Sequence, residues 1–378
     1  MNTLELIRLR HKLHRYPELS GEEENTAALI RDYIRKYEPD QIVEHIAGNG
    51  LAFVFEGKKE GPVVLFRCEL DALPIQDVND LEYKSVKEGV GHKCGHDGHM
   101  VMVAGLAHYL SKNRPERGKV ILLYQPEEET GQGAEKVVKD EKYKKLKVDY
   151  VFALHNLPGY NKGEVVLRRG VFASASKGMI MKLQGKSSHA GEPENGINPA
   201  MAIARIIQRF NDLYKNKEIF KDFSLITIIH SRIGERAFGT NPGYGELMAT
   251  LRSYRNDDME VLTEKTLEIA QEIAKEEKVK LEVSWVEEFP ASVNDDKCVD
   301  LIREICEEKE FDHSFRDQPF KWSEDFAHFL LKHKGTLFGL GSGTKSPQLH
   351  NPDYDFPDEI IEKGTKIFNN IYKKLLDS

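Results

Sequence analysis

Three short apolar runs in this chain each lead into residues that bind metal ions. Residues 63–66 precede Glu69 and Asp71, residues 120–124 precede Glu127-Glu128-Glu129, and residues 150–154 precede His155. Runs of this length and composition are typical of strands that are buried on both faces of a parallel sheet. In open α/β sheets, ligands bind just beyond the carboxyl ends of such strands. We therefore expect the acidic residues and the histidine to converge on one site.

The 378-residue length favours two domains. Strands and helices alternate from residue 61 to about residue 167, as in an α/β layer. Residues 174–287 predict the order strand-helix-strand-strand-helix-strand, which is the ferredoxin-like plan. We therefore predict a discontinuous catalytic domain, residues 1–173 and 288–378, and an inserted domain, residues 174–287.

Charge and targeting signals narrow the class of protein. The net charge is -8 and is spread along the chain, which argues against a nucleic-acid partner. The first residues lack the apolar core of a signal peptide, and no run approaches the roughly 18 apolar residues of a membrane span. The four cysteines are too scattered for a disulfide framework. These features predict a cytoplasmic protein without a membrane partner, in which Cys94 is available as a thiolate.

The densest cluster of potential metal ligands is His92-Lys93-Cys94-Gly95-His96-Asp97-Gly98-His99. Cys94 and His96 are two residues apart, so in an extended chain their side chains point the same way. A thiolate and an imidazole together suit zinc, manganese, cobalt or nickel. The alternative is a polar loop whose histidines cap the following helix. A zinc finger is disfavoured because no second Cys-x-x-Cys or His-x-x-x-His follows.

The triplet Glu127-Glu128-Glu129 follows the second apolar run. Adjacent side chains diverge at a strand end, so one carboxylate can hold a metal ion while its neighbour faces a water molecule. A metal ion lowers the pKa of water from about 16 towards about 7, and a nearby carboxylate can then accept its proton. Taken alone, an acidic triplet is more often a solvated turn.

These motifs together resemble the M20 metallopeptidases, most closely the branch of N-acyl-amino-acid amidohydrolases that includes hippurate hydrolases and auxin-conjugate hydrolases. The resemblance covers essentially the whole chain, with the motifs in the same order. The matching segments are Glu69–Pro74, Cys94–His99, Gln125–Glu129, Gly131–Ala134, Leu154-His155, Gly185–Ala190, Ser323–Phe326 and Leu349-His350. The implied fold is α/β, with a larger zinc-peptidase-like catalytic domain, whose mixed sheet is flanked by helices, and an inserted ferredoxin-like α+β domain.

The resemblance implies two divalent metal ions per subunit and a set of five ligands. The ligands would be Cys94, His96, Glu129, His155 and His350, with Cys94 bridging the two ions. Glu128 would be the general base and acid. Asp71 and Asp97 would orient ligand histidines. Glu127, His92 and His99 would not bind metal, and Glu69 stands where this branch often has Asp.

Two further residues gain a role only from the resemblance. His189 would otherwise be an exposed histidine in a Gly/Ser loop. The resemblance implies a homodimer through the inserted domain, in which His189 reaches the partner's active site and hydrogen-bonds the developing oxyanion. Arg252 would bind the substrate carboxylate, which suits a bidentate guanidinium; an ordinary surface arginine is the alternative.

One departure affects the substrate site. The family often has Asn-x-x-Pro before the strand that ends at Arg252. Pro242 matches the proline, but Gly239 occupies the asparagine position, and Asn241 lies two residues away. The sequence therefore departs from the family at the position of this asparagine.

The predicted function is hydrolysis of the amide bond of small N-acyl amino acids. A dipeptidase or aminopeptidase of the same fold is the alternative, although a free-amine substrate needs an acidic anchor that the sequence does not identify. A non-catalytic binding protein of this fold is the other alternative. The intact Glu128 and the complete ligand set argue against it.

Overall fold

The computed structural model describes residues 2–377 and divides the chain into two compact units. The larger unit comprises Met1–Phe172, Ser292–Gln318 and Asp325–Ser378, and the smaller comprises Ala173–Ala291 and Pro319–Glu324. We predicted that residues 1–173 and 288–378 form the catalytic domain, whereas residue 173 and residues 288–291 and 319–324 group with the smaller unit. The segment 319–324 lies farthest from the predicted boundaries. The cause of its grouping is local pairing, since the amide of Ser174 donates to the carbonyls of Phe320 (3.0 Å) and Trp322 (3.1 Å).

The larger unit contains an eight-stranded sheet in the order β1-β2-β4-β3-β5-β16-β6-β15. The strands are β1 (Gln41–Ile46), β2 (Gly50–Glu56), β3 (Val63–Glu69), β4 (Lys119–Gln125), β5 (Tyr150–Pro158), β6 (Val165–Leu167), β15 (His313–Phe315) and β16 (Lys334–Gly343). Strand β3 is parallel to β4 and β5, whereas β2 is antiparallel to β1 and β4. The prediction of a mixed sheet is confirmed. A short pair, β7 (Gly170–Ala173) and β14 (Ser292–Asn294), lies outside this sheet.

The centre of this sheet explains where a ligand can bind. Every residue of β3 is buried, as expected for a strand covered on both faces. The chain passes from β3 to β4 on one side, and β5 then pairs with β3 on the other side. Such a reversal of strand order opens a crevice beyond the carboxyl ends of the strands.

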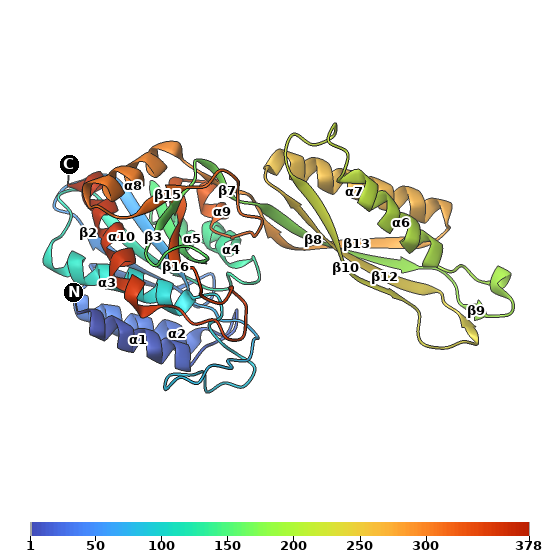
Figure 1. The fold of residues 1–378 in the computed structure, drawn as a ribbon, viewed down its shortest axis with the longest axis horizontal. Helices are drawn as coiled ribbons and strands as arrows, with labels where there is room; N and C mark the ends of the chain where they lie inside the picture. Colours follow the sequence, from blue (N-terminus) through green and yellow to red (C-terminus); the bar gives the residue numbers. More distant parts are fainter. Residues whose placement is uncertain (1, 378) are drawn as a thin grey trace. The chain divides into compact units, whose positions relative to one another are not determined.

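The helices of the larger unit are shown in Figure 1. They are α1 (Thr3–Arg15), α2 (Glu24–Ile34), η1 (Arg35–Tyr37), α3 (His96–Lys112), α4 (Gly133–Lys139), α5 (Glu141–Lys144), α8 (Asp296–Glu308), α9 (Ala327–Leu330), η3 (Asp358–Ile360) and α10 (Ile361–Leu376). Helix α3 packs on β3 and contacts α1 and α10, and its residues 96–107 are all buried. Among the described residues, none of the helices has the length and apolarity needed to cross a membrane.

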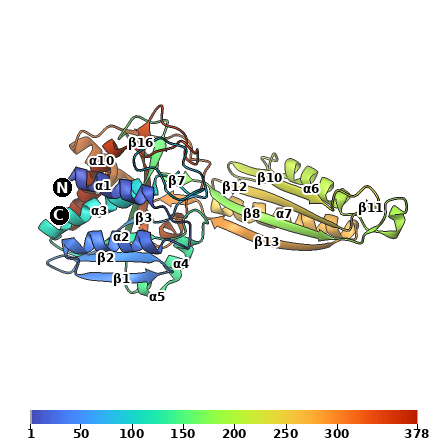
Figure 2. The same cartoon turned by 90° about the horizontal axis from the view of Figure 1, so that it is seen from below.

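The smaller unit has the predicted order of elements. These are β8 (Ala175–Gln184), α6 (Ala200–Leu213), β10 (Ser224–Ile233), β12 (Tyr244–Ser253), α7 (Asn256–Glu276) and β13 (Lys280–Phe289), with β9 (Ser188–His189), η2 (Pro193–Asn195) and β11 (Thr240–Asn241) in the connections. The antiparallel sheet has the order β10-β12-β8-β13, and α6 and α7 cover one face (Figure 2). Alternation along β8, where Met181 and Leu183 are buried and Lys182 is exposed, places the apolar face against these helices.

Candidate metal centre and active site

The loop from Cys94 to His96 brings two potential ligands to the start of α3. We expected an extended segment here, but Gly95 is left-handed (φ 96°) and α3 begins at His96. A Cβ atom at Gly95 would also lie 2.5 Å from the Asn156 side chain, so this position requires glycine on two grounds. The Cys94 and His96 side chains converge because of this turn, and extended geometry plays no part.

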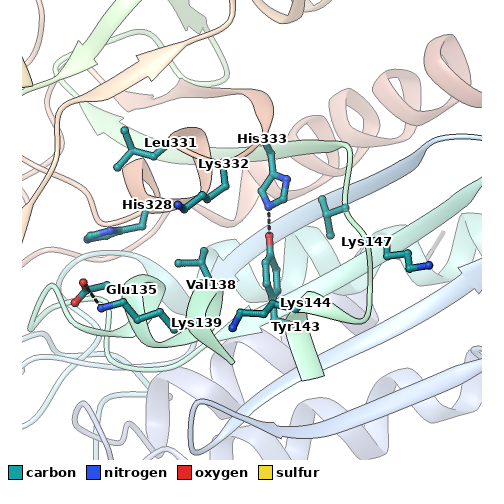
Figure 3. A pocket seen from close by; sticks show the side chains of 11 residues that line it. Glu135, Val138, Lys139, Tyr143, Lys144, Lys147, His328, Leu331, Lys332 and His333 are labelled. Carbon is teal, nitrogen blue, oxygen red and sulfur yellow. Dashed lines mark hydrogen bonds and ion pairs between the residues drawn. The ribbon is translucent and has the colours of Figure 1, made fainter. Parts of the chain in front are cut away.

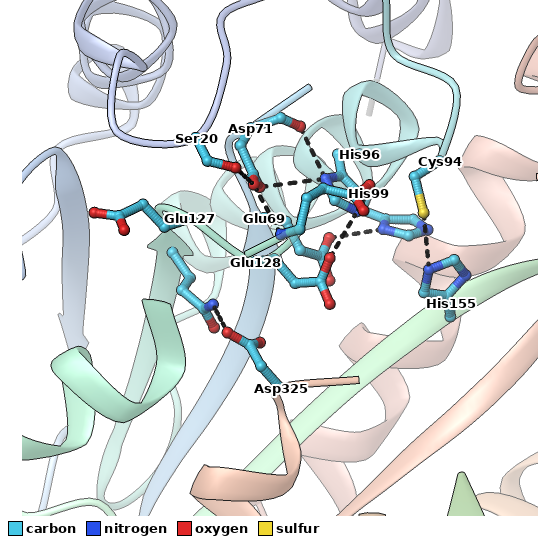
Figure 4. A network of polar contacts seen from close by, with 12 residues as sticks. Ser20, Glu69, Asp71, Cys94, His96, His99, Glu127, Glu128, His155 and Asp325 are labelled. Atoms are coloured by element: carbon cyan, nitrogen blue, oxygen red, sulfur yellow. Dashed lines mark hydrogen bonds and ion pairs between the residues drawn. The ribbon is translucent and has the colours of Figure 1, made fainter. Parts of the chain in front are cut away.

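The five predicted metal ligands lie together in the larger unit. Their donor atoms form two sets that share Cys94: one contains Cys94, His96 and His155, and the other contains Cys94, Glu129 and His350. Within each set all donor atoms lie within 4.8 Å of one another. Figure 4 shows Cys94, His96 and His155 facing one another. Two donor sets that share one thiolate could hold two neighbouring cations.

Backbone carbonyls fix the tautomers of both buried histidines in the cluster. His96 Nδ1 donates to the Asp71 carbonyl at 2.9 Å, and His155 Nδ1 donates to the Asn156 carbonyl at 2.9 Å. In the neutral rings each Nε2 therefore carries a lone pair. His96 Nε2 is buried and has no hydrogen-bond partner within residues 2–377, as expected for an atom that ligates a metal ion.

The cluster carries a strong negative potential. Burial alone lowers the pKa of His96, but the carboxylates of Glu69, Asp71 and Glu129 outweigh it and raise that pKa to about 10. A field that favours an imidazolium also favours a divalent cation in the same place. The donor chemistry and the electrostatics therefore both fit a metal centre.

His350 differs from the other members of the cluster. Its side chain is 52% exposed, and its Nε2 lies 3.6 Å from Glu129 Oε2. Its backbone is left-handed (φ 65°), which is uncommon outside glycine, and its amide donates to the Lys93 carbonyl at 2.8 Å. This hydrogen bond to Lys93, the residue before Cys94, holds the conformation and brings the imidazole to the edge of the cluster.

Of the three glutamates after β4, only Glu127 points away from the other two, although we expected adjacent side chains to diverge. Glu128 and Glu129 face His96, with carboxylate oxygens 3.7 and 3.8 Å from Nε2. Glu127 points away from the cluster (Figure 4) and pairs with Lys136 at 2.5 Å. Glu128 is therefore beside the donor sets, where a carboxylate can exchange a proton with a water molecule.

Asp71 and Asp97 occupy different environments. Asp71 contacts His96 through its carbonyl and, more loosely, through Oδ1 at 3.5 Å. Asp97 does not contact a ligand histidine; its Oδ2 accepts from Arg10 Nη1 (3.0 Å) and His14 Nδ1 (2.9 Å). Our expectation that Asp97 orients a ligand histidine therefore does not describe its contacts. It ties the first turn of α3 to α1 instead.

A buried polar network supports the loops of the site. The sequence analysis assigned no role to two of its members, Arg67 and Asp325. Arg67 bonds to Glu69, to Gln125 Oε1 (2.8 Å) and to Asp325 Oδ1 (2.6 Å). Asp325 Oδ2 in turn accepts from Gln125 Nε2 (2.7 Å) and from the amide of Ala134 (2.8 Å). The available signal was an arginine inside a strand predicted to be buried on both faces, because a buried charge needs partners.

Glu69 and His99 also belong to this network and are not metal ligands in this arrangement. Burial would raise the pKa of Glu69, but Arg67 and the neighbouring histidines hold it well below its usual range. Glu69 Oε2 accepts from His99 Nδ1 at 2.7 Å, and His99 Nε2 accepts from the amide of Asn156 at 3.2 Å. Both ring nitrogens of His99 are therefore occupied. His92 is also buried, lies outside the donor sets, and has a pKa lowered to about 3 by burial.

In the smaller unit, His189 is exposed on β9, which pairs with β11. Its Nδ1 accepts from the amide of Gly191 at 3.1 Å, so the neutral ring carries its proton on Nε2. Asn241 donates to Ser188 Oγ (3.0 Å) and accepts from Asn198 Nδ2 (2.8 Å). The shifted asparagine thus braces the loop that carries His189.

Arg252 is half-buried near the end of β12 in the smaller unit. Its Nη1 donates to the Lys321 carbonyl (2.9 Å) and to Ser323 Oγ (3.1 Å). These contacts fix one edge of the guanidinium. Ser323 belongs to the Ser-Glu-Asp-Phe motif, so they also connect Arg252 to that motif.

A pocket of about 710 Å³ lies elsewhere in the larger unit, between the α4–α5 region and residues 328–333 (Figure 3). It is lined by four lysines, and Tyr143 bonds to His333 Nε2 at 2.9 Å in its wall. It contains none of the predicted metal ligands.

Comparisons with known proteins show the family and the fold of the chain. The sequence model of Peptidase family M20/M25/M40 matches residues 65–374. The chain is 29% identical over 381 residues to an N-acetyl-L-cysteine deacetylase of Bacillus subtilis strain 168, covering 100% of this chain and 90% of that protein. It is 27% identical over 374 residues to a hippurate hydrolase of Campylobacter jejuni, covering 98% and 97%. In fold, it matches the crystal structure of a dinuclear metal-binding M20 peptidase of Bacillus subtilis, with a TM-score of 0.84, 24% identity and coverage of 100% and 98%.

Proposed function

Because the chain belongs to Peptidase family M20/M25/M40, we propose that it is a metal-dependent amidohydrolase that cleaves the amide bond of N-acyl amino acids. The observation that carries the proposal is the pair of donor sets that share Cys94, with Glu128 beside them. The deacylating activities named for the two relatives support this substrate class.

We propose that these two donor sets, which have Cys94 in common, would hold two divalent ions. Zinc, manganese, cobalt or nickel would suit a site of one thiolate, three imidazoles and one carboxylate. Bound there, the ions supply Lewis-acid polarisation of the amide carbonyl and lower the pKa of a water molecule.

Glu128 would carry out both proton transfers, and Arg252 would bind the substrate. Glu128 accepts a proton from the attacking water while the water oxygen bonds to the amide carbon. Glu128 delivers a proton to the amide nitrogen as the C–N bond breaks, which releases a carboxylate and an amino acid. Arg252 would pair with the free carboxylate of the substrate, with its edge held by Ser323.

We propose that His189 completes the site of a partner subunit in a homodimer formed through the smaller unit. The hydrogen bonding of His189 supports this proposal. The Gly191 amide occupies Nδ1 and leaves Nε2–H as a donor, the group that an oxyanion needs. An exposed position on a short strand pair in the smaller unit also suits a residue that acts across an interface.

A substrate comparison tests the proposal. With each of the four metals, the protein should hydrolyse N-acetyl and N-benzoyl amino acids with higher kcat/KM than dipeptides that have a free amine. A reversed preference would favour the dipeptidase or aminopeptidase. Stoichiometric metal binding without hydrolysis of either class would favour a non-catalytic binding protein.

Replacement of Cys94 should affect metal binding and stability together. We expect Cys94→Ala to lower metal content and to lower Tm in the presence of metal, because a bound metal stabilises the folded form. Cys68→Ala is the matched control. Cys68 is also fully buried, but its thiol faces the Leu123 carbonyl at 3.8 Å.

Elemental analysis and thermal unfolding, each with and without metal, measure both effects. Cys68→Ala should keep its metal and the metal-dependent rise in Tm. Equal metal loss in the two variants would contradict the assignment of Cys94.

A further inference from the structure

The segment from Glu18 to Glu23 contacts the loops that follow β3 and β4. The Glu18 carbonyl accepts from the amide of Ala72 at 2.8 Å, and Ser20 Oγ donates to Asp71 Oδ2 at 2.7 Å. Glu23 Oε1 accepts from the amide of Glu127 at 2.9 Å. The connection between α1 and α2 thus reaches both loops that form the active site.

Glu23 is fully buried, and its contacts are all with hydrogen-bond donors. Oε1 accepts from the amides of Gly21 (2.8 Å) and Glu127 (2.9 Å), and Oε2 accepts from Asn49 Nδ2 (3.0 Å). Glu23 stands at the N-cap position of α2, yet its side chain makes no capping hydrogen bond to that helix. A carboxylate that is buried but does not cap its own helix is directed instead at the loop after β4.

The amides on both sides of Glu128 are held by carboxylates. Glu23 accepts from the amide of Glu127, and Asp71 Oδ2 accepts from the amide of Glu129 at 2.9 Å. Glu127 itself is left-handed (φ 56°), a conformation that a non-glycine residue keeps only when its surroundings hold it. The backbone that carries Glu128 is thus held at the amides of both neighbouring residues.

We propose that Glu23 is a positioning residue for Glu128, acting through the Glu127 amide; the inference rests on the proposed function of Glu128. A hydrogen bond from a backbone amide to a carboxylate is stronger than one between neutral groups. Without it, Glu127 relaxes from the left-handed region and the Glu128 carboxylate moves relative to the donor sets. Glu23 touches neither substrate nor metal.

The test compares two variants of Glu23 with one matched control. Glu23→Ala should lower kcat by about 10²-fold, the scale of a 1 Å misplacement of a catalytic group, with a smaller change in KM. Glu23→Gln should restore most of kcat, because its amide oxygen still accepts from Glu127. Glu18→Ala is the control. Glu18 is a buried carboxylate of the same segment whose oxygens bind Asn25 and Thr26.

Amide hydrogen exchange in the metal-free protein gives a readout that needs no substrate. Glu23→Ala should speed exchange at Glu127 by about tenfold or more, the scale for losing a hydrogen bond to a charged group, whereas Glu18→Ala should not. Glu23→Asp, which retracts the carboxylate by one methylene, replaces Glu23→Ala if that variant does not fold.

The outcomes separate the two proposals. Unchanged exchange at Glu127, or equal loss of kcat in Glu18→Ala and Glu23→Ala at equal stability, overturns the role of Glu23. If the wild type hydrolyses no N-acyl amino acid, the proposed function fails, and exchange at Glu127 alone decides whether Glu23 holds this loop.

Discussion

Glu128→Gln is expected to lose turnover by about 10²–10⁴-fold or more, the usual scale for a general acid–base group, while it keeps its metal ions. The amide cannot accept a proton from water or return one to the leaving nitrogen. The predicted ligands are unchanged in this variant, so metal content should match that of the wild type. Measurements of kcat on an N-acetyl amino acid and elemental analysis on the same samples provide the test.

Glu127→Gln is the matched control for this experiment. Glu127 is the adjacent residue of the same loop, and its side chain points away from the cluster and pairs with Lys136. The substitution keeps the backbone amide that bonds to Glu23. Near-normal activity is expected. If Glu128→Gln were equally active, Glu128 would be removed from the mechanism.

His189→Ala is expected to lower kcat by about 10²–10³-fold without loss of metal, the scale for removing one oxyanion donor. His189 lies in the smaller unit, whereas all five predicted ligands lie in the larger unit, so metal content should not respond. We expect kcat to fall and KM to change much less, because the oxyanion forms only as the reaction proceeds.

Mixing the two inactive variants tests whether His189 acts across a dimer interface. A heterodimer of His189→Ala and Glu128→Gln pairs an intact Glu128 in one subunit with an intact His189 in the other. One of the two sites is then complete, and activity should approach about half of the wild-type value in the pure heterodimer. If subunit exchange is verified and no activity returns, His189 acts within its own chain or has no catalytic role.

Local patterns predicted the three central strands of the larger unit and the order of elements in the smaller unit, because burial imposes a periodicity on the residues. The runs at 63–66, 120–124 and 150–154 became β3, β4 and β5, and β3 pairs with both of the others in parallel. The strands β1 and β2 were not predicted. Strand β2 is apolar and buried, but its antiparallel place beside β4 follows no local signal.

The sequence by itself determined the mixed α/β plan, the ferredoxin-like order of the smaller unit, and the residue types that meet in the donor cluster. The side-chain type decides which residues can bind a metal ion, and it is read directly from the sequence. The ends of predicted parallel strands can also be located in the sequence, and ligands bind at these ends.

Only the tertiary structure decided how those residues are held. Arg67 and Asp325 are 258 positions apart, Asp97 bonds to α1 and to no ligand histidine, and Glu23 reaches Glu127 across 104 positions. A periodic pattern reports which face of an element is buried. It does not report which distant charge satisfies a buried one, because that partner is chosen by the packing of the whole unit.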